Sequence, residues 1–123
     1  TKEKALEACR QRLSEVHLDN AEVLHCGPKK LPLDKDSLDG ALLAFVLHEV
    51  KDKTGLLAEA ERSMQKGGWL AVLEWYKQAM EDGPPLEDRV SEEEVKELGQ
   101  KAGLRFVSER DLNGQNYLVL FRK

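Results

Sequence analysis

The feature that most constrains this fold is an unbroken apolar run in the middle of the chain, Gly40–Leu47. The run is too short to cross a bilayer, and it lacks the alternation of a strand with one face in water. An uninterrupted run of this length is typical of a strand in a parallel sheet that helices cover on both faces. We therefore predict a buried strand over 40–47.

A second apolar run, Trp69–Tyr76, follows a polar segment that we predict to be a helix over 54–66. Thr54 is placed to cap the start of that helix, and Gly67-Gly68 is expected to end it in the left-handed conformation. Two buried strands joined by a helix form a βαβ unit, in which the strands are parallel and the crossover is right-handed.

The parallel arrangement predicts where a site lies. Ligands of open α/β sheets bind outside the carboxyl ends of the strands. His48 and Glu49 stand at the end of the first strand, and Trp75 and Tyr76 stand at the end of the second. Any site is expected among these residues.

The N-terminal part predicts a helix over Thr1–Val16, followed by a short strand over Glu22–Cys26. Apolar residues at helical spacing form one stripe on the helix: Leu6, Cys9, Leu13 and Val16. We expect Cys9 and Cys26 to be free and buried, with a disulfide between them as the alternative, and hence a reducing, cytoplasmic location.

The C-terminal part begins with an irregular loop over 78–89, which contains Gly83-Pro84-Pro85 and resembles a lid or binding loop. Ser91 and Glu94 form a capping box that predicts a helix over Glu92–Ala102. Two strands, 104–111 and 115–122, flank Asn113-Gly114, a strong signal for an antiparallel hairpin.

Length and charge exclude several classes of protein. A chain of 123 residues suits a single domain, which we place over 1–123. Its 19 Lys and Arg residues against 23 Asp and Glu residues give a net charge of -4, without a basic patch for nucleic acid. No apolar run predicts a membrane span. No His, Cys and Asp cluster has the spacing of metal ligands.

Five short motifs together resemble the C-terminal part of a class I S-adenosylmethionine-dependent methyltransferase, of the group that includes quinone-biosynthesis methyltransferases. In order along the chain these are Leu31-Pro32-Leu33, Ser37-Leu38-Asp39, Leu47-His48-Glu49-Val50, Lys66-Gly67-Gly68 and Gly103-Leu104-Arg105-Phe106. The resemblance implies a Rossmann-like α/β sheet of strand order 3-2-1-4-5-7-6, incomplete here, with parallel strands and a C-terminal antiparallel hairpin. It also implies a small-molecule methyl acceptor.

The resemblance further implies roles for particular residues. His48 and Glu49 would flank the reacting atoms, against the alternative of a solvated turn. Glu74, Trp75, Tyr76 and Arg89 would shape the acceptor pocket, against the alternative that an ion pair between Glu74 and Arg89 holds the loop. The contacts implied for S-adenosylmethionine come from Gly27, Leu31, Ala44, Phe45, Val46 and Leu47. The alternatives are that Phe45 is a core residue and that Leu31 covers the edge of the sheet.

The chain also departs from the family pattern. No Gly-x-Gly-x-Gly occurs in the sequence, although this loop approaches the cofactor's amino-acid moiety in the family, and Gly27 stands where the family often has an acid near the adenine. We therefore expect a methyltransferase fragment that binds the cofactor poorly and is inactive by itself. Micromolar cofactor affinity measured by calorimetry would contradict this expectation.

The same departure predicts an association. In the family, strands 1 and 2 lie between strands 3 and 4, so the strand over 40–47 is expected to expose an apolar edge. We predict a homo-oligomer formed through that edge, against the alternative that the predicted strand Glu22–Cys26 pairs with it. The alternative function is a non-catalytic, methyltransferase-like module for dimerisation or partner binding.

Overall fold

The computed structural model describes residues 2–24 and 30–123. Its helices are α1 (Lys2–Glu15), α2 (Lys53–Ser63) and α3 (Glu92–Lys101), with short 3-10 helices η1 (Leu47–Glu49) and η2 (Leu86–Asp88). Its strands are β1 (Leu38–Ala44), β2 (Met64–Trp75), β3 (Arg105–Asp111) and β4 (Asn116–Arg122). Within this described part, no helix is long and apolar enough to cross a membrane.

The strands form one sheet of order β1-β2-β4-β3. Strand β1 is parallel to β2, and β4 is antiparallel to both of its neighbours. The turn between β3 and β4 contains Gly114 at a φ of 78°, a left-handed conformation that glycine adopts without steric cost. The predicted α/β sheet with parallel strands and a closing antiparallel hairpin is confirmed, and its order matches the 4-5-7-6 part of the expected order.

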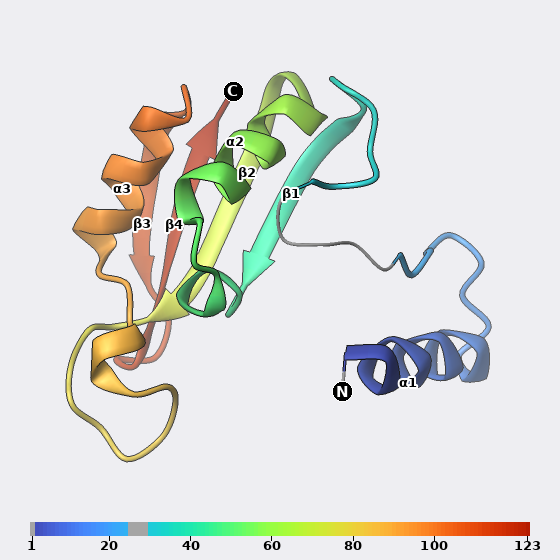
Figure 1. Cartoon of the computed structure of the whole chain (residues 1–123), viewed down its shortest axis with the longest axis horizontal. Helices are drawn as coiled ribbons and strands as arrows, with labels where there is room; N and C mark the ends of the chain where they lie inside the picture. The colour runs from blue at the N-terminus through green and yellow to red at the C-terminus, as the bar shows by residue number, and fades with distance from the viewer. Residues whose placement is uncertain (1, 25–29) are drawn as a thin grey trace.

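One face of the sheet carries the core. Helices α2 and α3 lie side by side on this face (Figure 1). Residues alternate between faces along a strand, and in β2 the inward positions are Leu70, Val72 and Glu74, all fully buried. Other fully buried side chains of this layer are Leu47, Leu57, Met64, Val95, Tyr117, Val119 and Phe121.

The opposite face of the sheet is less covered. Leu42 of β1 is 57% exposed, and Trp69 of β2 is 40% exposed. Trp69 alternates with the inward residues Leu70 and Val72 of β2, so its side chain points to this opposite face. Leu42 pairs with Ala71, which lies between the same two inward residues, so Leu42 points to the same face. Apolar side chains of β1 and β2 therefore reach solvent on this face.

Two predictions about α2 are wrong. The helix starts at Lys53, and its N-cap is two residues earlier than predicted, Asp52 and not Thr54: the Asp52 carboxylate accepts a hydrogen bond from Gly55 N–H at 2.9 Å. The helix also ends at Ser63, not at Gly67. Residues 65–68 of β2 lie opposite the single residue Asp39 of β1, which makes this part of β2 a bulge. Gly67, with a φ of 85°, adopts its left-handed conformation within this bulge.

The predicted start and end of α3 are confirmed. The Ser91 hydroxyl accepts a hydrogen bond from Glu94 N–H at 3.2 Å. Val90 and Val95, placed by sequence as a hydrophobic staple, are both buried. Gly103, with a φ of 88°, follows the last turn.

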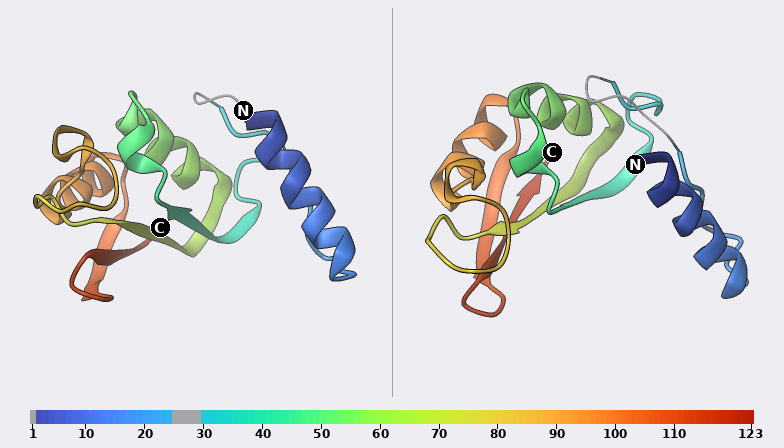
Figure 2. Two further views of the ribbon diagram at one scale, coloured as in Figure 1. Left: turned by 90° about the horizontal axis from the view of Figure 1, so that it is seen from below. Right: turned by 60° about the horizontal axis from the view of Figure 1, so that its bottom comes forward.

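The N-terminal part differs from the prediction. Helix α1 forms, but it lies apart from the sheet (Figure 2), so its apolar stripe is not buried. Cys9 is a free and exposed thiol, which makes the prediction of a buried cysteine wrong there. Residues 22–24 form no strand, because they lie away from a sheet edge whose backbone groups would pair with them (Figure 1). Cys26 and the rest of that predicted strand lie outside the described residues.

Candidate functional site

The carboxyl end of β1 makes an abrupt turn at Phe45. Its φ is 57°, a left-handed conformation that is uncommon for a residue with a bulky side chain. The Phe45 N–H still donates to the Leu73 carbonyl at 2.9 Å, which continues the pairing of β1 with β2. The chain then enters η1, and this turn brings His48 to the end of the sheet.

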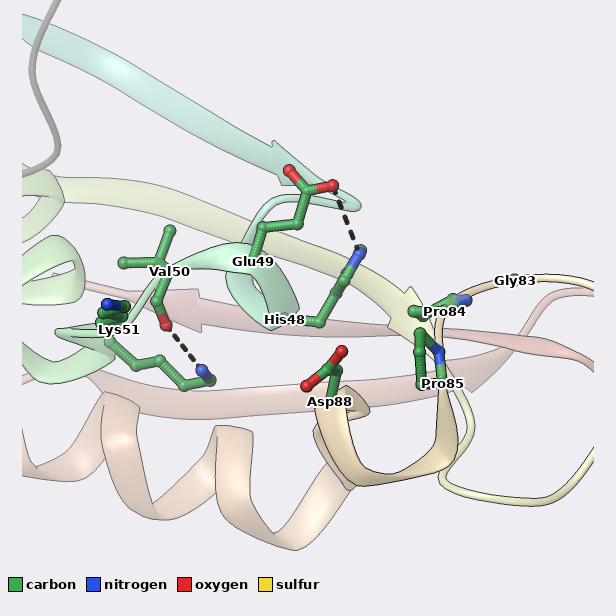
Figure 3. Close-up of a pocket in the computed structure, with 9 residues that line it drawn as sticks. His48, Glu49, Val50, Lys51, Gly83, Pro84, Pro85 and Asp88 are labelled. Atoms are coloured by element: carbon green, nitrogen blue, oxygen red, sulfur yellow. Dashed lines mark hydrogen bonds and ion pairs between the residues drawn. The ribbon is translucent and has the colours of Figure 1, made fainter.

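A cavity of about 670 Å³ lies beside this turn. One wall comes from the segment after β1, and the facing wall comes from the loop after β2 (Figure 3). The lining residues are His48, Glu49, Val50, Lys51 and Lys53 on the first wall and Gly83, Pro84, Pro85 and Asp88 on the second. The loop predicted over 78–89 thus borders a cavity at the predicted edge of the sheet.

Glu74 contacts His48 of the cavity lining and is itself fully buried. Its two carboxylate oxygens each lie 2.9 Å from His48 Nδ1. The carboxylate also accepts hydrogen bonds from the backbone N–H groups of His48, at 3.0 Å, and Trp75, at 3.2 Å. A buried carboxylate is tolerated only when such donors replace its water.

His48 therefore stands between two carboxylates. Its side chain is 9% exposed, and its Nε2 lies 3.8 Å from Oε1 of the exposed Glu49. Figure 3 shows the ring and the Glu49 carboxylate approaching each other at the cavity. The two predicted catalytic residues are thus brought together at the lining of one cavity.

Arg89 organises the loop after β2. It is almost fully buried, with Nε donating to the Pro84 carbonyl at 2.9 Å and Nη2 donating to the Asp82 carbonyl at 2.7 Å. Nη1 donates to the Tyr76 carbonyl at 3.2 Å, and the guanidinium lies 5.5 Å from the Trp75 ring centroid. The alternative that an ion pair between Glu74 and Arg89 holds the loop is therefore wrong. Arg89 holds the loop by donating to backbone carbonyls, and Glu74 binds His48 instead.

The aromatic residues at the end of β2 pack within the fold. The Trp75 ring lies 5.8 Å from that of Phe45, and the Tyr76 ring lies 5.3 Å from that of Tyr117. Desolvation, and then a hydrogen bond with Asp111, raise the pKa of Tyr76 to about 12. Neither Trp75 nor Tyr76 belongs to the lining of the cavity beside His48.

The residues predicted to contact the cofactor are spread over different places. Ala44, Phe45 and Val46 lie together at the carboxyl end of β1, whereas the Leu47 side chain is fully buried in the core. Leu31 lies beside α2, where its N–H donates to Glu59 Oε1 at 2.9 Å. Gly27 lies outside the described residues.

The role of Glu74 toward His48 was missed by sequence reasoning. The signal was a lone carboxylate in a run of apolar residues, Trp69-Leu70-Ala71-Val72-Leu73-Glu74-Trp75. A charged residue on the inward face of a buried strand requires a partner. Sequence alone did not indicate which partner, because the candidates lie far from Glu74 along the chain.

Comparison with known proteins gives a consistent family. The family described as "Methyltransferase domain" matches residues 1–72. A demethylmenaquinone methyltransferase of Listeria monocytogenes is 32% identical over 72 residues, which are 58% of this chain and 30% of that protein. A ubiquinone/menaquinone biosynthesis C-methyltransferase of Campylobacter jejuni is 38% identical over 58 residues, which are 47% of this chain and 25% of that protein.

A solved structure extends the similarity to the C-terminal part of the chain. The SAM-dependent methyltransferase from Aquifex aeolicus has a TM-score of 0.88 and 28% sequence identity, and the match covers 94% of this chain and 62% of that one. In the methyltransferases of Listeria and Campylobacter, the part that aligns with this chain is about a quarter to a third of their length. The order and direction of β1, β2, β4 and β3 agree with this similarity.

Proposed function

Because this chain belongs to the methyltransferase domain family, we propose that it forms the acceptor side of an S-adenosylmethionine-dependent methyltransferase that acts on a small molecule. The observation that supports this most directly is the cavity at the carboxyl ends of the parallel strands, between His48 and the loop that holds Pro84 and Pro85. Open α/β sheets bind their ligands at this edge.

The residues at the end of β1 fit one part of the cofactor. Phe45 is 39% exposed and Val46 is 37% exposed, and together they offer an apolar surface to the nucleoside and thioether parts of S-adenosylmethionine. When bound, the cofactor supplies a methyl group on a sulfonium sulfur. Contacts from Gly27, Leu31, Ala44 and Leu47 stay predictions.

The acceptor is proposed to be an aromatic ring of the quinol type. The names of the relatives from Listeria and Campylobacter support this class. The rings of Pro84 and Pro85 give one wall of the cavity an apolar surface, while His48 and Glu49 face it with polar groups. Holding acceptor and methyl donor in line supplies much of the acceleration in such a transfer. Contacts of Trp75, Tyr76 and Arg89 with the acceptor also stay proposals.

The full-length gene product tests this function. Incubated with S-adenosylmethionine and 1,4-naphthalenediol, it is expected to release S-adenosylhomocysteine and methylated product, both measured by mass spectrometry. Exchanging Glu97 for Gln on the exposed face of α3 should leave the rate unchanged. Failure to methylate hydroquinones, catechols and amines alike would rule the proposal out. Weak cofactor binding by the 123-residue chain alone stays a prediction, as does a cytoplasmic location.

Association through β1 is a separate proposal. This strand is at the edge of the sheet, and its Leu42 side chain is 57% exposed. Edge strands pair with other chains unless charge or shape prevents it. We expect the sedimentation coefficient of the chain to rise with concentration, and Leu42→Lys to reduce this rise. A monomer mass at every concentration would contradict the proposal. The same edge supports the second candidate function, a module for dimerisation or partner binding.

A further inference from the structure

The contacts of Glu74 determine how the imidazole of His48 is oriented. Glu74 is fully buried, and both of its oxygens lie 2.9 Å from the same ring nitrogen, Nδ1. The backbone N–H of His48 donates to Glu74 as well. One carboxylate therefore fixes both the start of η1 and the ring that projects from it.

These contacts assign the tautomer of the ring. An ionised carboxylate only accepts hydrogen bonds, so Nδ1 must carry the proton that it donates to Glu74. In the neutral ring the remaining lone pair then belongs to Nε2. A base that removes a proton needs such a lone pair.

The ring nitrogen that keeps its lone pair, Nε2, lies on the cavity side. Nε2 is the atom of His48 that approaches Glu49, at 3.8 Å, and both side chains line the cavity opposite Pro84 and Pro85 (Figure 3). Nδ1, by contrast, is turned toward the buried Glu74. The His48 ring thus contacts the buried Glu74 carboxylate on one side. On its other side it faces a cavity large enough for a small aromatic molecule.

We infer that Glu74 is a positioning residue that holds His48 as the base for an acceptor carrying an acidic O–H group, such as a phenol or hydroquinone. This inference rests on the proposed function. Nε2 takes the proton of the acceptor hydroxyl while the electron pair of the O–H bond stays on the acceptor. Bound S-adenosylmethionine would supply the methyl carbon to the deprotonated acceptor, and the electron pair of the broken C–S bond would leave with sulfur. The imidazolium is stabilised by Glu74 and returns its proton to water.

A structural role alone explains Glu74 less well. Buried ion pairs are often replaced by apolar residues without loss of stability, so their presence in a core needs another reason. The neighbours of Glu74 on the inward face, Leu70 and Val72, show that β2 otherwise fills this layer with apolar side chains. The Glu74 carboxylate stands at the last inward position of β2 and binds His48, which lines the cavity.

The tautomer is measurable in the 123-residue chain without cofactor or acceptor. At a pH high enough for the ring to be neutral, we expect ¹⁵N NMR to show His48 with a proton on Nδ1 and a lone pair on Nε2. In Glu74→Gln the amide NH₂ becomes a donor facing Nδ1, so the ring should change to the tautomer protonated on Nε2. Glu49→Gln, which removes the carboxylate on the other side of the ring, should keep the wild-type tautomer. His48→Gln identifies the signal among the three histidines.

Kinetics of the full-length gene product test the role as a base. With 1,4-naphthalenediol, Glu74→Gln should lower kcat about 100-fold and leave KM within about three-fold, since general bases contribute roughly 10²–10⁴ in rate. Glu97→Gln is the matched control. A wild-type ring protonated on Nε2, or a Glu74→Gln variant with the wild-type tautomer, overturns the positioning. If Glu74→Gln keeps the wild-type kcat, the role of His48 as a base is refuted while the proposed function stands. If the wild-type protein transfers no methyl group, both the role of His48 and the proposed function are refuted.

Discussion

Replacing Phe121 with alanine is expected to lower the free energy of unfolding by about 3–5 kcal/mol, the usual cost of removing a buried aromatic ring. Phe121 is fully buried on β4, and its ring meets that of Phe106 edge to face at a centroid distance of 6.5 Å. Single domains are stable by only about 5–15 kcal/mol. Urea denaturation followed by circular dichroism should therefore show a large fall in the midpoint.

Gly99 supplies a sharper test of the same contact. A Cβ at Gly99 would lie 2.2 Å from a carbon of the Phe121 ring, which shows how closely α3 approaches β4. Gly99→Ala is expected to destabilise by about 1–3 kcal/mol through overpacking, although alanine favours helix by up to about 1 kcal/mol. In a Phe121→Ala background the methyl group enters the space left by the ring, so the cost should shrink or reverse. Strictly additive effects would contradict this contact, and Gln100→Ala on the exposed side is the control.

The second large effect is a loss of stability in alkali, caused chiefly by Tyr117. Tyr117 is fully buried and its hydroxyl donates to the Val90 carbonyl. Desolvation, and then the negative charge of Glu74, raise the pKa of Tyr117 well above its ordinary value of 10.0. Below pH 10 the phenol is neutral in both the folded and the unfolded chain, so its contribution to stability is complete there.

Above pH 10 the unfolded chain loses the phenolic proton and the folded chain keeps it. Stability should then fall by up to about 1.4 kcal/mol per pH unit for Tyr117, until the folded pKa is reached. The chain has only two tyrosines, Tyr76 and Tyr117, so tyrosinate absorbance reports these residues alone. We expect no ionisation near pH 10 in the folded state, ionisation near pH 10 in urea, and a shallower pH dependence in Tyr117→Phe. A wild-type titration that matches the one in urea would refute this.

Local sequence signals predicted the parts of the fold whose causes are local. The Asn113-Gly114 turn and the Ser91 cap act within a few residues, and both appear as expected. The apolar runs predicted that β1 and β2 are strands, but the prediction for 40–47 is wrong in two respects. Strand β1 ends at Ala44, and it is not buried on both faces, since its Leu42 side chain is 57% exposed. The N-cap of α2 is Asp52 and not the predicted Thr54, and an aspartate is at least as good an N-cap as a threonine.

Signals that depend on distant partners were harder to interpret. Gly67-Gly68 resembles a helix end, yet the helix stops earlier and Gly67 serves a bulge opposite Asp39. The stripe of α1 is amphipathic in sequence, but amphipathicity does not determine which surface a helix packs on. In the candidate site, His48 and Glu49 were predicted from their place after a strand. Glu74 was predicted near the site as a partner of Arg89, whereas its contact with His48 is seen only in the structure.

The guanidinium of Arg89 has a mechanical consequence for the loop after β2. It binds carbonyls of Tyr76, Asp82 and Pro84 at once, so one planar group fastens both arms of the segment to the end of the sheet. Moving one part of this segment strains the contacts that the same guanidinium makes with the other parts. We therefore expect the residues between Tyr76 and Arg89 to move together as one unit when a ligand binds or leaves.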